Sequence, residues 1–170
     1  MILVHNYGYI KPLIMNKLFD IACNFTSNRF NEDLDKVIVN AIDKNVDKFL
    51  LVSAEMGDID RILDINNLYP NNCYFTSGVH PHHANDFFDE SPSILDKLVI
   101  QHNPNAIGET GLDFFRNISS YDNQVYAFEE QIKIAIKHNK PLFLHQRDSH
   151  RDFINVLNKY KNYLPKCVVH

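Results

Sequence analysis

Apolar segments of two different periodicities alternate along most of this chain, and this alternation limits its fold more than any other feature. Short runs rich in branched and aromatic residues predict β-strands. Between them lie segments whose apolar residues recur every three or four positions, as in helices with one buried face. The pattern predicts six strands, at residues 17–25, 46–54, 73–80, 105–110, 141–145 and 166–170, and five helices, at residues 32–43, 57–68, 91–102, 122–138 and 149–160.

The predicted strands are apolar along nearly their whole length. Such strands are typical of a parallel sheet covered by helices, because both faces of the sheet are then buried. An open doubly wound sheet and an eight-stranded barrel both fit the alternation. No glycine-rich phosphate loop follows the first strand, which weakens the case for a dinucleotide-binding fold. The positions of the polar residues, described below, favour an α/β barrel of the (β/α)8 TIM type.

Charge, cysteine content and the length of the apolar runs exclude several classes of protein. The net charge of -4 argues against broad electrostatic binding to nucleic acid, although a small site could still bind one phosphate. No run approaches the roughly 18 consecutive apolar residues of a membrane span. Cys23, Cys73 and Cys167 lie scattered in apolar runs, so we expect three buried thiols and a cytoplasmic protein.

The first residues of the chain are interpreted as an extension and not as a targeting segment. They lack the basic region and the small-residue cleavage site of a signal peptide. Met15 is a second candidate for the start of translation. We expect residues 1–14 to be an N-terminal extension and residues 15–170 to be the folded domain.

Polar side chains gather where the predicted strands end. These residues are Asp20, Asn24, His80, Glu109, His145 and His170, with Arg147 just beyond His145. In a parallel barrel the carboxyl ends of the strands share one face, and that face carries the active site. Glu109 and the histidines therefore form a predicted ligand set for a divalent cation such as zinc or manganese. A glutamate can also bridge two ions, as two-metal hydrolases require.

Each of these residues also has an interpretation that involves no metal. A histidine at a strand end commonly forms a hydrogen bond in a core or a loop, and the histidines around Pro81 could form one polar loop. Glu109 could pair with Arg116 or Arg147. Three further histidines on predicted helices are interpreted as surface residues: His102, His138 and His150. The recurrence of Glu or His at the ends of four successive strands favours the metal site.

Five stretches of the chain together resemble the TatD family of metal-dependent deoxyribonucleases. They are FDIACNFTS, GVHPHHA, AIGETGLDFFRN, FEEQIKIAIKHNKPLFLHQRDSH and CVVH, and they keep the family's order and spacing from Phe19 to His170. The resemblance implies a (β/α)8 barrel of the metal-dependent hydrolase type. It also implies hydrolysis of phosphodiester bonds in DNA, commonly at a 3′ end of a single strand, with one or two divalent ions (Mg, Mn or Zn).

The same resemblance implies roles for the residues at the strand ends. Glu109 matches the family's bridging metal ligand. His145 and His170 match its two later histidine ligands. His80 and Arg147 match catalytic residues that are expected to face the scissile phosphate.

Residues further from the reacting atoms are implied to support this site. Asp113 matches a carboxylate close to the metal, and Arg116 is implied to help hold the substrate. Many members begin with Asp-x-His-x-His, whereas Ala22 and Asn24 replace both histidines here. Asp20 and Asn24 are therefore expected to support the site from its outer layer, with one metal position weaker than in those members.

The chain also departs from the family's pattern at its C-terminal end. A full barrel takes roughly 250 residues, and this sequence has 170, with about six of the eight expected strands. The family's late aspartate, which follows the seventh strand, has no counterpart. We expect the N-terminal part of a barrel whose unclosed sheet exposes its edges and could self-associate. A metal hydrolase of other esters or amides, and a non-catalytic remnant, remain as alternative functions.

Overall fold

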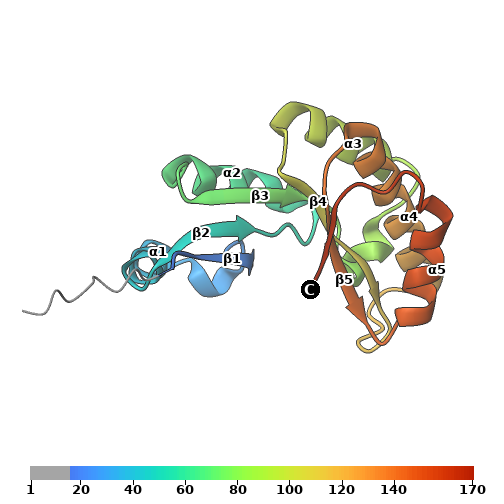
Figure 1. Ribbon diagram of the computed structural model, residues 1–170, viewed down its shortest axis with the longest axis horizontal. Coiled ribbons are helices and arrows are strands. Elements are labelled where there is room, and N and C mark those ends of the chain that lie inside the picture. Colours follow the sequence, from blue (N-terminus) through green and yellow to red (C-terminus); the bar gives the residue numbers. More distant parts are fainter. Residues whose placement is uncertain (1–15) are drawn as a thin grey trace, which may run out of the picture.

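The computed structural model describes residues 16–170 and places them in one parallel sheet with helices along its outside (Figure 1). The sheet has six strands in chain order, and each is parallel to its neighbour. The strands are β1 (Leu18–Cys23), β2 (Val46–Leu51), β3 (Cys73–Ser77), β4 (Ala106–Asp113), β5 (Leu142–Arg147) and β6 (Cys167–Val169). The expected extension, residues 1–14, lies outside the described residues.

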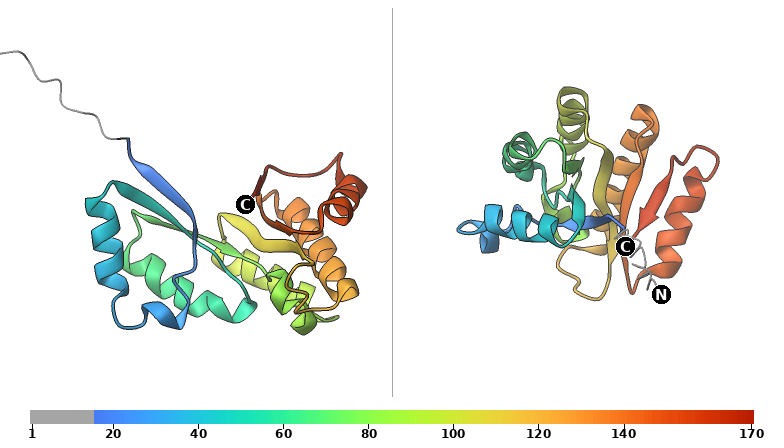
Figure 2. Two further views of the ribbon diagram at one scale, coloured as in Figure 1. Left: turned by 90° about the horizontal axis from the view of Figure 1, so that it is seen from below. Right: turned by 60° about the vertical axis from the view of Figure 1, so that its left-hand side comes forward.

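Five α-helices connect these strands and surround the outer face of the curled sheet (Figure 2). They are α1 (Leu34–Asp43), α2 (Ile59–Leu68), α3 (Ser91–His102), α4 (Tyr121–His138) and α5 (His150–Tyr160). The predicted incomplete barrel is confirmed. Three short 3-10 helices, which the periodicity did not predict, are η1 (Asn28–Phe30), η2 (Met56–Asp58) and η3 (Pro81–Asp86). Within residues 16–170, none of the helices has the length and apolar character that crossing a membrane requires.

Local sequence explains where the longer helices begin and end. The Ser120 side chain accepts a hydrogen bond from the backbone N–H of Asn123 at 3.3 Å and so caps α4. Asn139 ends the same helix in the left-handed conformation, at φ 49°. Pro92 lies in the first turn of α3, where a missing N–H costs nothing.

The hydrophobic core lies mainly between the sheet and its helices. Phe128 and Ile132 of α4 belong to one cluster with Ile107 and Leu112 of β4, the strand that α4 covers, and all four side chains are fully buried. A second cluster joins α1 and α2 to the first three strands. Burial of side chains of this size is worth about 1.5–3 kcal/mol each, so the helix-facing side of the sheet supplies most of the stability.

The opposite, concave side of the sheet is an apolar groove of about 340 Å³. Its lining comes from all six strands and their N-terminal flanks: Phe19, Ile21, Leu50, Tyr74, Asn105, Ala106, Pro141, Leu142, Phe143, Lys166, Cys167 and Val168. β1 and β6 are edge strands, which explains why Phe19, Ile21 and Val168 are exposed. The prediction of three buried thiols is wrong for Cys167, because this residue lies on the β6 edge; Cys23 and Cys73 are buried.

Candidate metal centre

Two glycines hold β4 close to β5 on either side of Glu109. Gly108 and Gly111 have φ values of +141° and +147°, which side-chain-bearing residues rarely adopt. A Cβ atom on Gly108 would lie 2.2 Å from the carbonyl oxygen of Phe143, and one on Gly111 would lie 2.0 Å from that of His145. The two glycines thus allow β4 to bring Glu109 beside His145.

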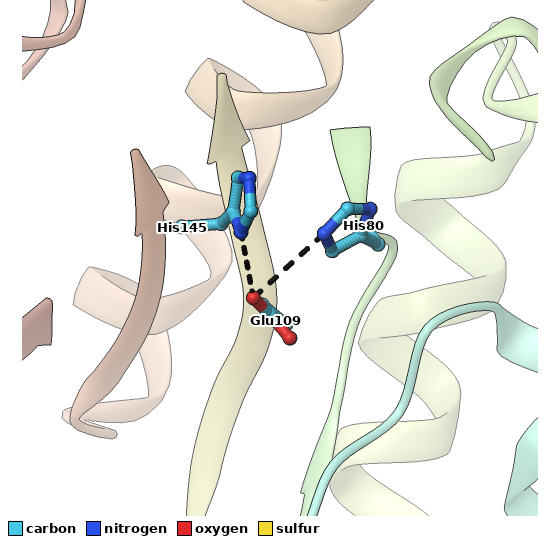
Figure 3. Close-up of side chains that lie close together, drawn as sticks. All are labelled: His80, Glu109 and His145. Carbon is cyan, nitrogen blue, oxygen red and sulfur yellow. Dashed lines mark hydrogen bonds and ion pairs between the residues drawn. The ribbon is translucent and has the colours of Figure 1, made fainter. Parts of the chain in front are cut away.

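One carboxylate oxygen, Oε1 of Glu109, is the centre of the site. Nδ1 of His145 and Nε2 of His170 each lie 2.9 Å from it, and Nε2 of His80 lies 3.7 Å away. Figure 3 shows His80 and His145 directed at Glu109, His145 from β5 and His80 from the segment that follows β3. One ligand atom each of His80, Glu109 and His145 lies within 4.8 Å of the others. The structure therefore brings together the residues that the sequence placed at separate strand ends.

The surroundings favour an anionic Glu109. Burial opposes ionisation of this carboxylate, but hydrogen bonding to His145 and the positive charges of nearby histidines together lower its pKa. Burial lowers the pKa of His80 to about 4, so its imidazole is neutral at pH 7. A carboxylate beside several imidazoles is a set of side chains that fits a divalent cation such as zinc or manganese.

Asp113 fixes the orientation of His145 from the other side of its ring. This carboxylate is only 1% exposed, and its Oδ2 atom lies 3.3 Å from Nε2 of His145. Its Oδ1 atom accepts a hydrogen bond from the Arg116 backbone N–H. Although burial opposes ionisation, this bond and the contacts with His82 and His145 lower the pKa of Asp113 to about 2. Burial opposes protonation of His145, but the two carboxylates together raise its pKa. The two carboxylates thus hold the His145 ring between them, with Nδ1 against Glu109 and Nε2 against Asp113.

His82 is part of this network, whereas the sequence pattern also allows it to lie in a simple polar loop. Its Nε2 atom lies 2.7 Å from Oδ2 of Asp113, and its ring contacts that of His80. His80 caps η3 by accepting a hydrogen bond from the His82 backbone N–H, and Pro81 occupies the first turn. The sequence signal that could have indicated a joint role for His80 and His82 is their position on either side of Pro81.

The remaining predicted residues lie at the rim of the site or beyond it. Asn24 lines a pocket of about 350 Å³ that also contains His80, His82, Glu109 and His170. Asp20 is exposed, and its carboxylate accepts a hydrogen bond from the Ala22 backbone N–H at 3.1 Å.

The two predicted substrate-facing arginines lie on the surface. Arg147 stacks on Phe115, with 3.8 Å between the guanidinium carbon and the ring centroid, and Arg116 is exposed. Among the described residues, the ion-pair partners of Glu109 are histidines, which contradicts the alternative pairing with an arginine. His150 is exposed as predicted, whereas His138 is half-buried because its Nε2 atom pairs with Asp96.

Two buried glutamines of α4 bind backbone groups of strand ends, a role that the sequence pattern does not indicate. Gln124 accepts a hydrogen bond from the Asp113 N–H at 2.8 Å and donates to the carbonyl oxygen of the same residue at 3.2 Å. Gln131 makes the same pair of bonds with Val79, the residue before His80. α4 therefore sets the positions of both the β3 and the β4 ends of the site.

Comparison with known proteins identifies the family. A model of the family described as TatD related DNase matches residues 19–170. The chain belongs to the TatD family. A TatD relative from Erwinia billingiae, named a 3′-5′ ssDNA/RNA exonuclease, is 39% identical over 90% of this chain. A relative of the same name from Cronobacter turicensis is also 39% identical over 90% of the chain. The chain spans 59% and 58% of the lengths of these two TatD proteins.

Solved structures agree with this assignment to the TatD family. A TatD family hydrolase from Entamoeba histolytica superimposes with a TM-score of 0.82 at 25% identity, covering 91% of this chain and 58% of that one. The TatD homologue YJJV from Escherichia coli gives a TM-score of 0.77 at 26% identity, covering 84% of this chain and 56% of that one. The half-barrel described here therefore corresponds to a little over half of each of these TatD-family structures.

Proposed function

We propose that this chain carries the metal-binding part of a TatD-type 3′-5′ exonuclease that hydrolyses phosphodiester bonds in single-stranded DNA. The observation that carries the proposal is the convergence of three imidazoles on one oxygen of Glu109. Relatives named as 3′-5′ ssDNA/RNA exonucleases support the reaction and the substrate class. The free thiols of the chain suit a reducing cytoplasm.

Glu109, His145 and His170 are the proposed ligands of one or two divalent ions, which we take to be Mg, Mn or Zn, and His80 lies beside them. Such an ion would supply a water of lowered pKa and would polarise a phosphoryl oxygen. Asp113 holds the Nε2–H of His145, which leaves Nδ1 directed at Glu109. The ring orientation is therefore set before any ion binds.

The proposed catalytic residues act on the phosphate. His80, neutral at pH 7, can donate an N–H to a phosphoryl oxygen at the mouth of the site. Arg147 follows His145 by two positions on β5 and supplies a permanent positive charge at the same rim. Asn24 and Asp20 belong to the outer layer, and Arg116 extends the positive charge along the β4–α4 connection. Together these groups balance the charge that develops on phosphorus-bound oxygens.

The experiment is metal analysis followed by a nuclease assay on the purified chain. We expect a stoichiometric divalent ion and metal-dependent shortening of single-stranded DNA from its 3′ end, with both lost in Glu109→Ala. His150→Ala, at an exposed histidine, is the matched control and should behave like the unaltered chain. Metal binding with cleavage only of small carboxylic esters or amides would contradict the nuclease. Failure to bind metal at all would support a non-catalytic protein.

A further inference from the structure

An exposed aromatic ring lies next to the proposed metal centre and has no role in it. Phe115 is 59% exposed, although burying a phenylalanine is normally favourable. It belongs to the connection between β4 and α4, two residues after Asp113. The same stretch also exposes Ile118 and Tyr121. This side chain forms an apolar surface at the rim of a polar site.

Arg147 covers one part of this ring and leaves its own donors available. The guanidinium carbon lies 3.8 Å from the centroid of the Phe115 ring, which is a cation–π contact. Stacking uses the flat face of a guanidinium, so its N–H groups at the edge can still bind a phosphate. Phe115 and Arg147 therefore combine an aromatic face with phosphate-binding donors.

The strand register places this pair directly beside the metal centre. In the β4–β5 pairing, Gly111 is opposite His145 and Asp113 is opposite Arg147. Residues two apart on a strand lie on the same side and are separated by roughly 6–7 Å. Arg147 is thus one such step beyond His145 along β5. A polymeric substrate with its scissile phosphate near His145 would extend over Phe115.

We infer that Phe115 and Arg147 form a subsite in which an unpaired nucleobase stacks on the ring while its phosphate binds the guanidinium. Aromatic side chains bind single-stranded nucleic acid in this way, and stacking on them tolerates any base. A paired base is stacked on both sides within its duplex, so the subsite selects single strands. With a net charge of -4, the chain needs such a local contact to hold a polyanion. The inference rests on the proposed function and adds the part of the substrate that is recognised.

Binding can be measured without cleavage, by fluorescence anisotropy of labelled oligonucleotides on the full chain in the presence of a chelator. The probes are a short single-stranded oligodeoxythymidylate, an abasic oligonucleotide of equal length, the matching RNA and a duplex. We expect Phe115→Ala to weaken binding of the single-stranded DNA about tenfold or more, and Phe115→Trp to restore it. Binding of the abasic probe and of the duplex should be little affected by either change. Binding of the RNA should fall in Phe115→Ala as that of the DNA does, because stacking involves the base and not the sugar.

Tyr163→Ala is the matched control, because Tyr163 is an exposed aromatic residue between α5 and β6, at the opposite end of the strands. It should bind every probe like the unaltered chain. The inference would be overturned if Phe115→Ala bound DNA as well as the unaltered chain does, or if binding of the abasic probe were weakened equally. It would also be overturned if the unaltered chain bound no probe. Metal-dependent cleavage that survives with no effect of Phe115 would leave the proposed function standing. Base-dependent binding through Phe115 without any cleavage would contradict the proposed exonuclease activity and would support the subsite.

Discussion

The side-chain amide of Gln131 pairs with both backbone polar groups of Val79. Its Oε1 atom accepts a hydrogen bond from the Val79 N–H at 2.8 Å, and its Nε2 atom donates to the Val79 carbonyl oxygen at 3.0 Å. The same nitrogen also lies 2.7 Å from the hydroxyl oxygen of Thr110, the residue after Glu109. One fully buried side chain thus joins the backbone next to His80 to the strand that carries Glu109.

Replacing this side chain should affect both stability and metal binding. Gln131→Leu keeps the volume but leaves the N–H and C=O groups of Val79 buried without partners. We expect a loss of about 3 kcal/mol in the free energy of unfolding, because each such group costs roughly 1–3 kcal/mol. Urea unfolding measures this loss, and titration calorimetry should show weaker metal binding. Gln101→Leu, at an exposed position of α3, is the control and should change neither quantity.

The Asp113 carboxylate should control metal affinity without binding the metal itself. Asp113→Asn keeps the shape but removes the charge that holds His145, and changes of this kind typically cost 10–100-fold in metal affinity. We expect a loss in that range by titration with Mn²⁺ or Zn²⁺. Asp43→Asn alters an exposed carboxylate at the end of α1, on the side of the sheet away from the site, and it should bind metal normally. Equal losses in both variants would contradict the role given to Asp113.

The positions of the strands along the chain and the convergence of the site could be predicted because both follow from general rules. Apolar periodicity locates strands and helices, and parallel connection brings the strand ends that carry Glu109, His145 and His170 to one face. Neither inference requires knowledge of side-chain packing, so both could be made from the sequence pattern.

Several residues could not be predicted in the same way, because their environments depend on contacts between distant segments. Gln124 and Gln131 are polar residues in an amphipathic helix, where they resemble surface residues until the neighbouring strand ends are placed. Phe115, as a phenylalanine, would be expected to lie in the hydrophobic core. Cys167 has apolar neighbours, but they do not reveal that β6 is an edge. Position within the assembled sheet decides each of these cases.

The three thiols should react at very different rates in the folded chain. Burial raises the pKa of Cys73 to about 11 and also raises that of Cys23, and both side chains are inaccessible. Partial burial also raises the pKa of Cys167, but this thiol is exposed beside the apolar groove, where a reagent can reach it. We expect one thiol to react readily with an aromatic disulfide reagent at neutral pH, and all three to react in urea. Cys167→Ser should abolish the reaction of the folded chain, and a persistent reaction in this variant would show that β1 or β3 opens.

The lowered pKa of His80 predicts that the metal-free chain loses stability in mild acid. An unfolded imidazole takes up a proton below about pH 6.5, whereas folded His80 does so only near pH 4. Between these values the unfolded state binds more protons, so the free energy of unfolding falls as the pH is lowered. From about pH 6.5 to pH 5 this loss in the free energy of unfolding is about 2 kcal/mol.

The test of this prediction compares variants, because His145 has a raised pKa and changes the stability in the opposite direction. With a chelator present, urea unfolding of His80→Gln should decline less over this range than that of the unaltered chain, and His150→Gln should follow the unaltered chain. An equally steep decline in the free energy of unfolding of His80→Gln would show that His80 is not neutral and buried. The proposed contact of His80 with phosphate would then lose its basis.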